Sequence, residues 1–326
     1  MIRIQLRPRL SPHAFPAAIY QVVGQSLIAD VAIPCLAPFS RDPTSPGDLP
    51  GENFSLALTG ATLPIGPIYN GKGWIGGQWQ TVQSWKIAGG YRLVIADIEH
   101  FTVATDGSAI VRLSETLTFS SPLLAEIVLG PVLLCALALK GIYCLHGSAV
   151  TFEDGTAIAF LGSSGAGKST LGGFLGGDPA SLWKSIADDV IALILIDGRP
   201  FLLPDFPQLK WSQAQQLTLL TRPRLPLARC YLLDALDVPQ PARVILYPPI
   251  SQRNAFLTFI NHTHAARLFD AELLRQHMGF CDHVARSVPV RRLQYPRDFA
   301  SLPQVAATLH CDLANSTGAV VYTADH

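Results

Sequence analysis

The sequence has 326 residues, a length that corresponds to about two domains of ordinary size. Hydrophobic residues make up 49% of it and charged residues 15%, which excludes an intrinsically disordered chain, since disorder requires few hydrophobic residues and a high net charge. Lys plus Arg equals Asp plus Glu at 24 each, so no overall charge attracts nucleic acid or an acidic membrane. Any site for a phosphate group must therefore be local.

The cysteines contain no CxxC pair, which argues against a zinc ribbon, a thioredoxin-like motif and a disulfide scaffold. Most have apolar neighbours and are expected to be small buried side chains in a reducing compartment. Residues 1–10 lack the apolar stretch of a signal peptide. These features predict a cytoplasmic protein.

The first part of the chain predicts a small β-rich domain over residues 1–118, in which no catalytic cluster stands out. A turn over residues 105–108 is expected to join the last two strands into a hairpin. The predicted strands cover residues 21–32 with a break at Gly24, 69–80 with turns, 91–98, 101–103 and 109–113.

Residues 121–140 predict a long apolar helix that is bent or delayed by Pro131 and ended by Gly141. Its stretch 123–139 is near the lower limit of about 17–25 residues for a membrane span, and it contains Glu126. A buried helix packed beneath the part of the chain that follows is therefore favoured over a membrane span. The second predicted domain, residues 119–326, begins with this helix.

From Cys144 onward the pattern alternates between strand and helix, which predicts an α/β fold. The predicted strands cover residues 145–152, 156–161, 186–196, 201–203, 230–233, 244–246 and 288–293. The predicted helices cover residues 168–175, 212–219, 254–260, 271–285 and 302–309.

Residues 162–169, GSSGAGKS, match the phosphate-loop motif GxxxxGK[ST], with an apolar strand before it and a helix after it. Glycines allow backbone N–H groups to point at phosphate oxygens, and the helix N-terminus adds partial positive charge. Lys168 supplies a charge for the β- and γ-phosphates, and the Ser169 hydroxyl is a ligand for Mg²⁺. The predicted nucleotide-binding residues are Gly162, Ser163, Ser164, Gly165, Ala166, Gly167, Lys168, Ser169 and Thr170.

Asp188 and Asp189 follow 20 residues after Lys168, which allows one helix and a return to the next strand (188 − 168 = 20). Adjacent residues of a strand point to opposite faces, so a site built from both carboxylates requires a local bend or a strand end here. One acid would then orient Mg²⁺, and the other would accept the hydroxyl proton during phosphoryl transfer. The alternative, a solvated turn, is disfavoured by the apolar residues on both sides.

Other candidates have structural alternatives of comparable weight. His146 lies near the expected exit of the phosphate loop, and the sequence leaves its role open between site and scaffold. The pair of histidines in residues 261–264 lacks an evident third zinc ligand. Three further sets remain open between binding and packing or solvation: Lys210 with Trp211, the arginines Arg222, Arg224 and Arg229, and the tryptophans Trp74, Trp79 and Trp85.

Three blocks, residues 145–150 (LHGSAV), 162–170 and 187–189 (ADD), resemble the catalytic domain of HPr kinase/phosphorylase, whose fold is shared with phosphoenolpyruvate carboxykinase. The whole layout resembles the HPr-kinase-like proteins of lasso-peptide biosynthesis, including FPQLKW at 206–211 and VRRLQYPRD at 290–298. Some of these proteins phosphorylate a Ser side chain at the C-terminus of the precursor peptide. The resemblance implies an α/β phosphate-loop core of the HPr kinase/phosphoenolpyruvate carboxykinase type, with a smaller β-rich N-terminal domain.

The resemblance also implies roles for individual residues. Asp188 would be the acid/base that activates the acceptor hydroxyl, and His146 would lie against the reacting phosphate, with Lys168 as the third catalytic residue. Ser169 and Asp189 would hold Mg²⁺, and the nucleotide would be ATP. Members of the HPr kinase family are oligomeric, so a homo-oligomer is an open expectation.

The sequence departs from the HPr kinase pattern in two places. The segment that carries a metal-binding Glu in that family reads LPDFP at residues 203–207, where only Asp205 could substitute. The Pro-Gly-Arg-Asn loop that the family uses for phosphorolysis is at best weakly similar to residues 249–254. The phosphorylase half-reaction, and HPr itself as substrate, are therefore not expected.

These observations favour an ATP-dependent serine kinase that acts on a hydroxyl of a peptide or small protein, with neither a nucleic acid nor a membrane as partner. Two alternatives remain. The first is a regulatory ATPase whose nucleotide state controls docking of a partner. The second is a kinase of a small hydroxyl metabolite.

Overall fold

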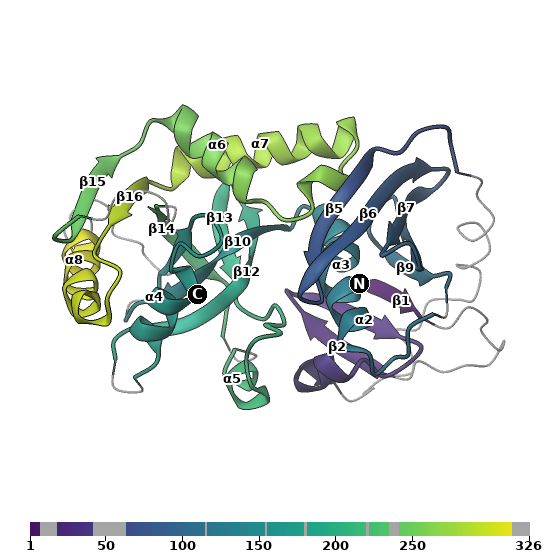
Figure 1. Cartoon of the computed structure of the whole chain (residues 1–326), viewed down its shortest axis with the longest axis horizontal. Coiled ribbons are helices and arrows are strands. Elements are labelled where there is room, and N and C mark those ends of the chain that lie inside the picture. The colour runs from purple at the N-terminus through teal and green to yellow at the C-terminus, as the bar shows by residue number, and fades with distance from the viewer. Residues whose placement is uncertain are drawn as a thin grey trace.

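The computed structural model describes residues 1–6, 18–41, 63–114, 116–153, 155–178, 181–219, 222–234 and 241–314. These residues form a mixed α/β protein with two lobes, each built around one β-sheet (Figure 1). The N-terminal lobe lies on the right of that view and the C-terminal lobe on the left.

The N-terminal lobe contains a nine-stranded sheet in the order β4-β2-β3-β1-β9-β8-β7-β6-β5. Its strands are β1 (Ile2–Gln5), β2 (Ala18–Val22), β3 (Gln25–Ala29), β4 (Ser40–Arg41), β5 (Tyr69–Ile75), β6 (Gln78–Ile87), β7 (Gly90–Ile95), β8 (Glu99–Ala104) and β9 (Ala109–Arg112). The predicted β-rich character is confirmed. Two segments predicted as broken strands, residues 21–32 and 69–80, lie in antiparallel hairpins formed by β2 with β3 and by β5 with β6.

The apolar stretch before the C-terminal lobe forms three helical segments: α2 (Pro122–Ile127), the π-helical η3 (Val128–Val132) and α3 (Leu133–Ala138). Gly130 has non-helical dihedral angles, and Pro131 follows it inside η3, which explains the break. Buried side chains of all three segments share one core with residues of the N-terminal sheet such as Leu93 and Phe101. The expectation that the helix packs beneath the second lobe is therefore incomplete, because most of it covers the first sheet.

None of the helices in the described part of the chain is long and apolar enough to cross a membrane. The stretch 123–139 is divided between three short segments, so it does not form one continuous apolar helix. The domain boundary placed at residue 119 stays a prediction.

The C-terminal lobe contains a seven-stranded sheet in the order β11-β10-β12-β13-β14-β16-β15. Because β11 also pairs with β14, strands β10 to β14 close into a small barrel. The strands are β10 (Tyr143–Thr151), β11 (Ala157–Leu161), β12 (Lys184–Ile196), β13 (Arg199–Leu203), β14 (Leu225–Leu233), β15 (Ile245–Pro249) and β16 (Val290–Gln294). The predicted alternation of strands and helices is confirmed for this lobe.

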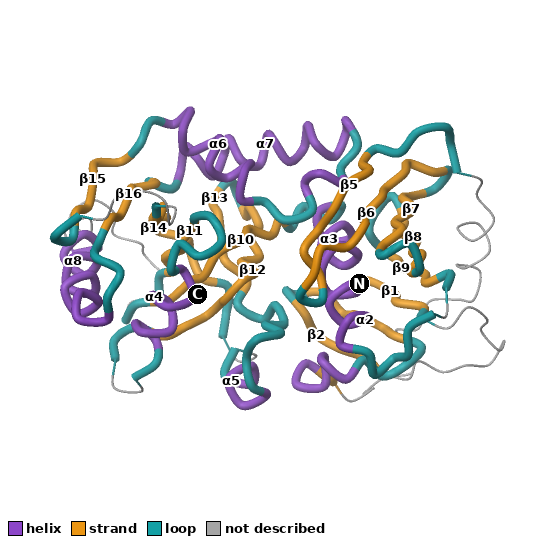
Figure 2. Tube along the Cα trace, viewed as in Figure 1, coloured by secondary structure: helices purple, strands orange, loops and turns teal. Residues whose placement is uncertain are grey.

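The helices of this lobe lie around the sheet. They are α4 (Lys168–Gly176), α5 (Gln213–Leu217), α6 (Gln252–His262), α7 (Ala271–Ser287) and α8 (Leu302–Ala314), and short 3-10 turns are η1 (Pro34–Phe39) in the N-terminal lobe, η4 (Ala266–Leu268) and η5 (Phe299–Ser301). Figure 2 shows α7 along the top of the view, reaching from one lobe to the other. There Asp270 caps α7 by accepting from the Leu273 N–H at 2.9 Å, and its carboxylate lies 3.0 Å from Lys86 Nζ of the N-terminal sheet.

A buried ion pair holds one end of the N-terminal sheet together. Both Glu99 oxygens accept from Arg112 at 2.7 Å, and both side chains are at most 1% exposed. The Ser114 hydroxyl and the Leu117 N–H complete the shell of the carboxylate at 2.8 and 2.9 Å. Burial acts to raise the pKa of Glu99, but these bonds outweigh it and lower that pKa overall.

We expect Glu99→Gln to lower the free energy of unfolding at pH 7 by about 3–5 kcal/mol, because it leaves the Arg112 charge buried without its counter-charge. A carboxylate with a lowered pKa stabilises the fold above its unfolded pKa, and this contribution is lost as the pH falls through the folded pKa. The difference between the two proteins should therefore shrink on acidification. Urea unfolding at several pH values measures it, and the exposed Glu272→Gln is the control. A pH-independent difference, or none, contradicts the prediction.

Candidate active site

The predicted phosphate loop connects β11 to α4. Its glycines Gly162, Gly165 and Gly167 have φ angles of +152°, +78° and +92°, which side chains other than glycine rarely adopt. A Cβ atom at Gly162 would also lie 2.8 Å from the carbonyl oxygen of Leu233 on β14. The backbone of the loop therefore requires glycine at these positions.

The Lys168 side chain lies across the loop. Its Nζ donates to the carbonyl oxygens of Gly162 and Ser163 at 2.9 Å each, the residue is 7% exposed, and burial lowers its pKa. The N-cap of α4 is Gly167, which has no side chain to bond the first-turn N–H groups. These N–H groups, together with the exposed Ser169, are available to an anion at the rim of the loop.

Ser148 of β10 fixes the start of α4. Its hydroxyl donates to the Lys168 carbonyl oxygen at 2.7 Å, and the residue is 1% exposed. A Cβ atom at Gly172 would lie 3.1 Å from that hydroxyl, so α4 rests closely on β10. Nothing in the local sequence pattern around Ser148 indicated this contact, because its partner lies 20 residues away.

Asp188 and Asp189 lie on β12, opposite Ser148 and Gly147 of β10. Asp189 has a φ of +127°, a strained conformation for a residue with a side chain that costs about 1–3 kcal/mol. This unusual backbone angle, called the kink below, lies where β12 still pairs in register with β10, and the register shift between the two strands falls between Ala149 and Val150. Both carboxylates act on the pKa of Lys168, which they raise against the larger lowering effect of burial. The strand continues through both acids, and the unusual φ of Asp189 is the local departure from regular strand geometry at this pair.

The two carboxylates have different surroundings. Asp189 Oδ1 lies 3.2 Å from Lys210 Nζ and 3.5 Å from His146 Nδ1. Burial acts to raise the pKa of Asp189, but Lys210 and the nearby histidines lower it overall. Asp188 Oδ1 is buried and has no hydrogen-bond partner among the described residues. Asp188 Oδ1 is thus uncommitted in the described structure but enclosed, so an incoming hydroxyl reaches it only when the atoms that cover it move.

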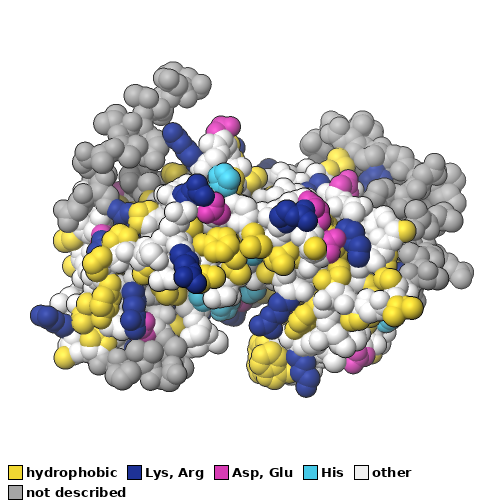
Figure 3. All heavy atoms as spheres, turned by 90° about the horizontal axis from the view of Figure 1, so that it is seen from above, with side chains coloured by type: hydrophobic (Ala, Val, Ile, Leu, Met, Phe, Trp, Pro, Cys, Tyr) yellow, Lys and Arg dark blue, Asp and Glu magenta, His cyan; other side chains and the backbone are white. Residues whose placement is uncertain are grey.

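Histidines line the wall of the site beside Asp189. The ring of His146 meets His264 edge-on at 5.2 Å, and His264 Nε2 lies 3.1 Å from the Asp189 carbonyl oxygen. Burial, with the charge of Lys168, lowers the pKa of His146 and of His262 to about 4. Figure 3, which views the molecule from above, shows histidine side chains grouped beside the hollow between the two lobes.

The motif at residues 261–264 does not form a zinc site within the described part of the chain, where no group of three or more His, Cys, Asp or Glu is arranged to hold a metal ion. It contributes to the site in another way. The His264 N–H donates to the Cys144 carbonyl oxygen at 2.7 Å, which brings this segment to the edge of β10. The hydrophobic periodicity of the sequence could not predict this contact, because Cys144 and His264 are far apart in the chain.

Asp205 contacts the N-terminal lobe. Its Oδ2 accepts from the Gly24 N–H of that lobe at 3.2 Å, and burial raises its pKa. One oxygen of this carboxylate therefore links the two lobes, and a metal-binding role in place of the glutamate of HPr kinase stays a prediction.

Two of the arginines considered as a phosphate clamp have other partners. Arg229 Nε lies 3.2 Å from the Asp312 carboxylate of α8, and the Arg224 guanidinium lies 5.6 Å from the centre of the Phe201 ring. Lys210 contacts Asp189, as described above, and Trp211 packs partly buried against the core of the C-terminal lobe.

The tryptophans differ in exposure. Trp85 is buried as a packing residue, whereas Trp74 and Trp79 form an edge-to-face pair on the surface, with 63% and 65% of each exposed. A peptide-binding role for this pair stays a prediction.

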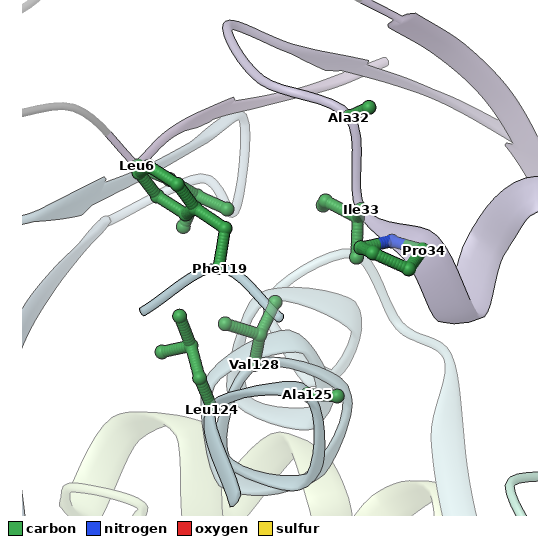
Figure 4. A pocket seen from close by; sticks show the side chains of 8 residues that line it. All are labelled: Leu6, Ala32, Ile33, Pro34, Phe119, Leu124, Ala125 and Val128. Atoms are coloured by element: carbon green, nitrogen blue, oxygen red, sulfur yellow. The ribbon is translucent and has the colours of Figure 1, made fainter. Parts of the chain in front are cut away.

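A pocket in the N-terminal lobe offers no polar chemistry. Figure 4 shows it between the end of β1, the start of η1 and the helix α2. It is lined by Leu6, Ala32, Ile33, Pro34, Phe119, Leu124, Ala125 and Val128. All of these side chains are apolar, so the candidate active site remains the phosphate loop with the Asp pair.

The chain was compared with protein-family models, curated proteins and solved structures. No protein-family model matches the sequence, and no curated protein matches it. Among solved structures, the HPr(Ser) kinase/phosphatase from Coxiella burnetii is similar over 53% of this chain and 97% of its own, with 11% sequence identity and a TM-score of 0.30. A TM-score of 0.30 is too low to establish a shared fold.

The two histidines with a pKa of about 4 make stability depend on pH. An unfolded histidine has a pKa of about 6.5, so between these values the unfolded chain binds more protons and acid destabilises the fold. We expect the thermal midpoint of the wild type to fall more between pH 7 and pH 4.5 than that of the double variant His146→Gln/His262→Gln. Equal falls in both proteins contradict the prediction.

Proposed function

We propose that this protein is an ATP-dependent kinase that transfers the γ-phosphoryl group to a Ser or Thr hydroxyl of a peptide or small protein. One observation carries the proposal: two adjacent carboxylates, Asp188 and the strained Asp189, both act electrostatically on the Lys168 ammonium of the phosphate loop. A nucleotide-binding loop alone is compatible with many reactions. Hydroxyl activation requires in addition a carboxylate that is not already paired, and Asp188, whose Oδ1 lacks a partner among the described residues, meets that condition.

The loop and α4 would bind the triphosphate. First-turn N–H groups of α4 and the Lys168 ammonium offer positive charge to the β- and γ-phosphates. The Ser169 hydroxyl and the Asp189 carboxylate are oxygen ligands of the kind that Mg²⁺ prefers, and Mg²⁺ usually takes only one or two protein ligands beside phosphates and water. A bound Mg²⁺ neutralises charge that develops on the phosphates.

Asp188 would act as the base. Its carboxylate accepts the proton of the acceptor hydroxyl as the hydroxyl oxygen forms a bond to the γ-phosphorus and the bond to ADP breaks. Asp189 is less suited to this step because Lys210 already pairs with it and its pKa is lowered. His146, neutral at pH 7 because burial lowers its pKa to about 4, lies beside Asp189 and would border the reacting phosphate.

The acceptor is the finer part of the proposal. A Ser near the C-terminus of a lasso precursor peptide is the acceptor that the sequence resemblance suggests. A cytoplasmic location and a homo-oligomeric state likewise stay predictions from the sequence.

Incubation with Mg²⁺, γ-labelled ATP and peptides that carry a Ser or Thr tests the activity. We expect labelled peptide from the wild type. Asp188→Asn should reduce the transfer rate by about 10²- to 10⁴-fold, the usual contribution of a general base, while calorimetry shows ATP binding little changed. Asp282→Asn on α7, where Asp282 pairs only with surface groups in the described structure, is the matched control.

Three outcomes would contradict parts of this proposal. Full transfer by Asp188→Asn removes Asp188 from the role of base. Free phosphate without labelled peptide favours a nucleotide-switched regulatory ATPase. Label that appears only on added small hydroxyl compounds favours a metabolite kinase.

A further inference from the structure

The strand that carries the Asp pair is paired unequally along its two edges. On one edge, β12 pairs with β10 from Lys184 to Leu193. On the other edge, β13 pairs with β12 only from Ala192 to Ile196. The backbone around Asp188 to Val190 therefore has no β13 residue beside it on that second edge.

The side chain of Gln208 takes the place of the missing strand. Its Oε1 accepts from the Asp188 N–H at 2.9 Å, and its Nε2 donates to the Val190 carbonyl oxygen at 3.0 Å. The same Nε2 is 3.2 Å from the Phe206 carbonyl oxygen, which orients the amide. The amide thus bonds to the backbone on both sides of Asp189, with its oxygen as acceptor for Asp188 and its nitrogen as donor to Val190.

These bonds enclose the strained residue. Asp189 has a φ of +127°, and such a conformation persists only where the surroundings fix it. Its neighbours are held by β10 on one edge and by the Gln208 amide on the other. Gln208 is 2% exposed, so water does not readily replace its bonds. Lys210, two residues further on, pairs with the Asp189 carboxylate at 3.2 Å.

We propose that Gln208 is a positioning residue that holds the kink at Asp189 and thereby directs the carboxylates of Asp188 and Asp189 toward the phosphate loop. This inference rests on the proposed kinase activity and adds a residue to it. Gln208 itself takes no proton and contacts no phosphate. Its effect passes through the backbone of the Asp pair.

The test is Gln208→Met, which keeps the length of the side chain and removes both its donor and its acceptor. Asp189 is then free to relax toward ordinary strand geometry, in which adjacent side chains point to opposite faces. We expect kcat for phosphoryl transfer to fall by about 100-fold, the scale of an ångström-level misplacement of a reacting group. The affinity for ATP without Mg²⁺, measured by calorimetry, should change little, because the loop and α4 are untouched, whereas KM for Mg²⁺-ATP also depends on Asp189, the proposed Mg²⁺ ligand.

Gln216→Met is the matched control. Gln216 is also buried, at 7% exposure, but its Nε2 donates to the Trp211 carbonyl oxygen at 3.3 Å, outside the Asp pair. It should keep both kcat and KM. Equal losses in the two variants would show general damage to the core and overturn the inference.

Gln208→Glu supplies a readout that a merely structural role would not move. A protonated carboxyl offers one donor and one acceptor, as the amide does, whereas the ionised form has no donor for Val190 and repels the Asp pair. We expect the optimum pH for transfer by Gln208→Glu to lie below that of the wild type. An unshifted optimum contradicts the inference. Because this test uses a different variant, it also decides the question if Gln208→Met does not fold.

The crystal structure of Gln208→Met provides a check without turnover. A φ at Asp189 that remains near +127° overturns the inference even if activity falls. A wild type that binds no ATP and transfers no phosphate refutes the proposed function, and the inference with it. A wild type that is active beside a fully active Gln208→Met refutes the inference alone.

Discussion

The kink at Asp189 is the constraint on which the candidate site depends. In regular β-structure, Asp188 and Asp189 would point to opposite faces of β12, and only one of them could face the phosphate loop. The φ of +127° at Asp189 departs from that regular geometry at a cost of about 1–3 kcal/mol. The surrounding bonds must offset that cost, and they come from β10 on one side and from the segment with Gln208 and Lys210 on the other.

The topology of the C-terminal lobe explains why the loop and the kink meet. Strand β10 lies between β11, which leads into the phosphate loop, and β12, which carries the Asp pair. Ser148 of β10 bonds to the start of α4, and it is also the residue opposite Asp188. One strand therefore fixes the loop, the helix and the acids relative to one another. The parallel pairing of β11 with β14 closes the barrel beside them.

A third acid near the loop has a different character. Asp234 follows β14, whose Leu233 carbonyl oxygen closely approaches Gly162. Its carboxylate receives two bonds from Arg292, at 2.6 and 2.9 Å, and a bond from Gln294. Burial acts to raise its pKa, but these bonds lower it overall. Of the acids close to the loop, Asp188 is the one with a buried oxygen that lacks a partner within the described residues, and this difference supports its assignment as base.

The sequence predicted what local chemistry determines. The order of strands and helices in the C-terminal lobe follows from short patterns and is confirmed. The predicted departure from regular strand geometry at the Asp pair agrees with the unusual φ of Asp189, and phosphate binding by the loop between β11 and α4 stays a prediction. The sequence could not predict which residues from distant segments reach the site. Ser148, Gln208 and His264 reach it through contacts 20 to 75 positions apart in the chain, and no periodicity encodes such contacts. The contact between Asp205 and Gly24, which lie 181 positions apart, is a further example.

The contact between Asp205 and Gly24 also bears on the role of the N-terminal lobe. Asp205 holds the β2–β3 turn at 3.2 Å, and three residues later Gln208 holds the kink in β12. A span of three residues is too short to absorb much displacement, since an extended chain advances only about 3.3–3.6 Å per residue. The β2–β3 turn and the backbone of the Asp pair are therefore both contacted by one short segment, residues 205–208. This segment is a place where the N-terminal lobe comes within a few residues of a group that bonds to the Asp pair.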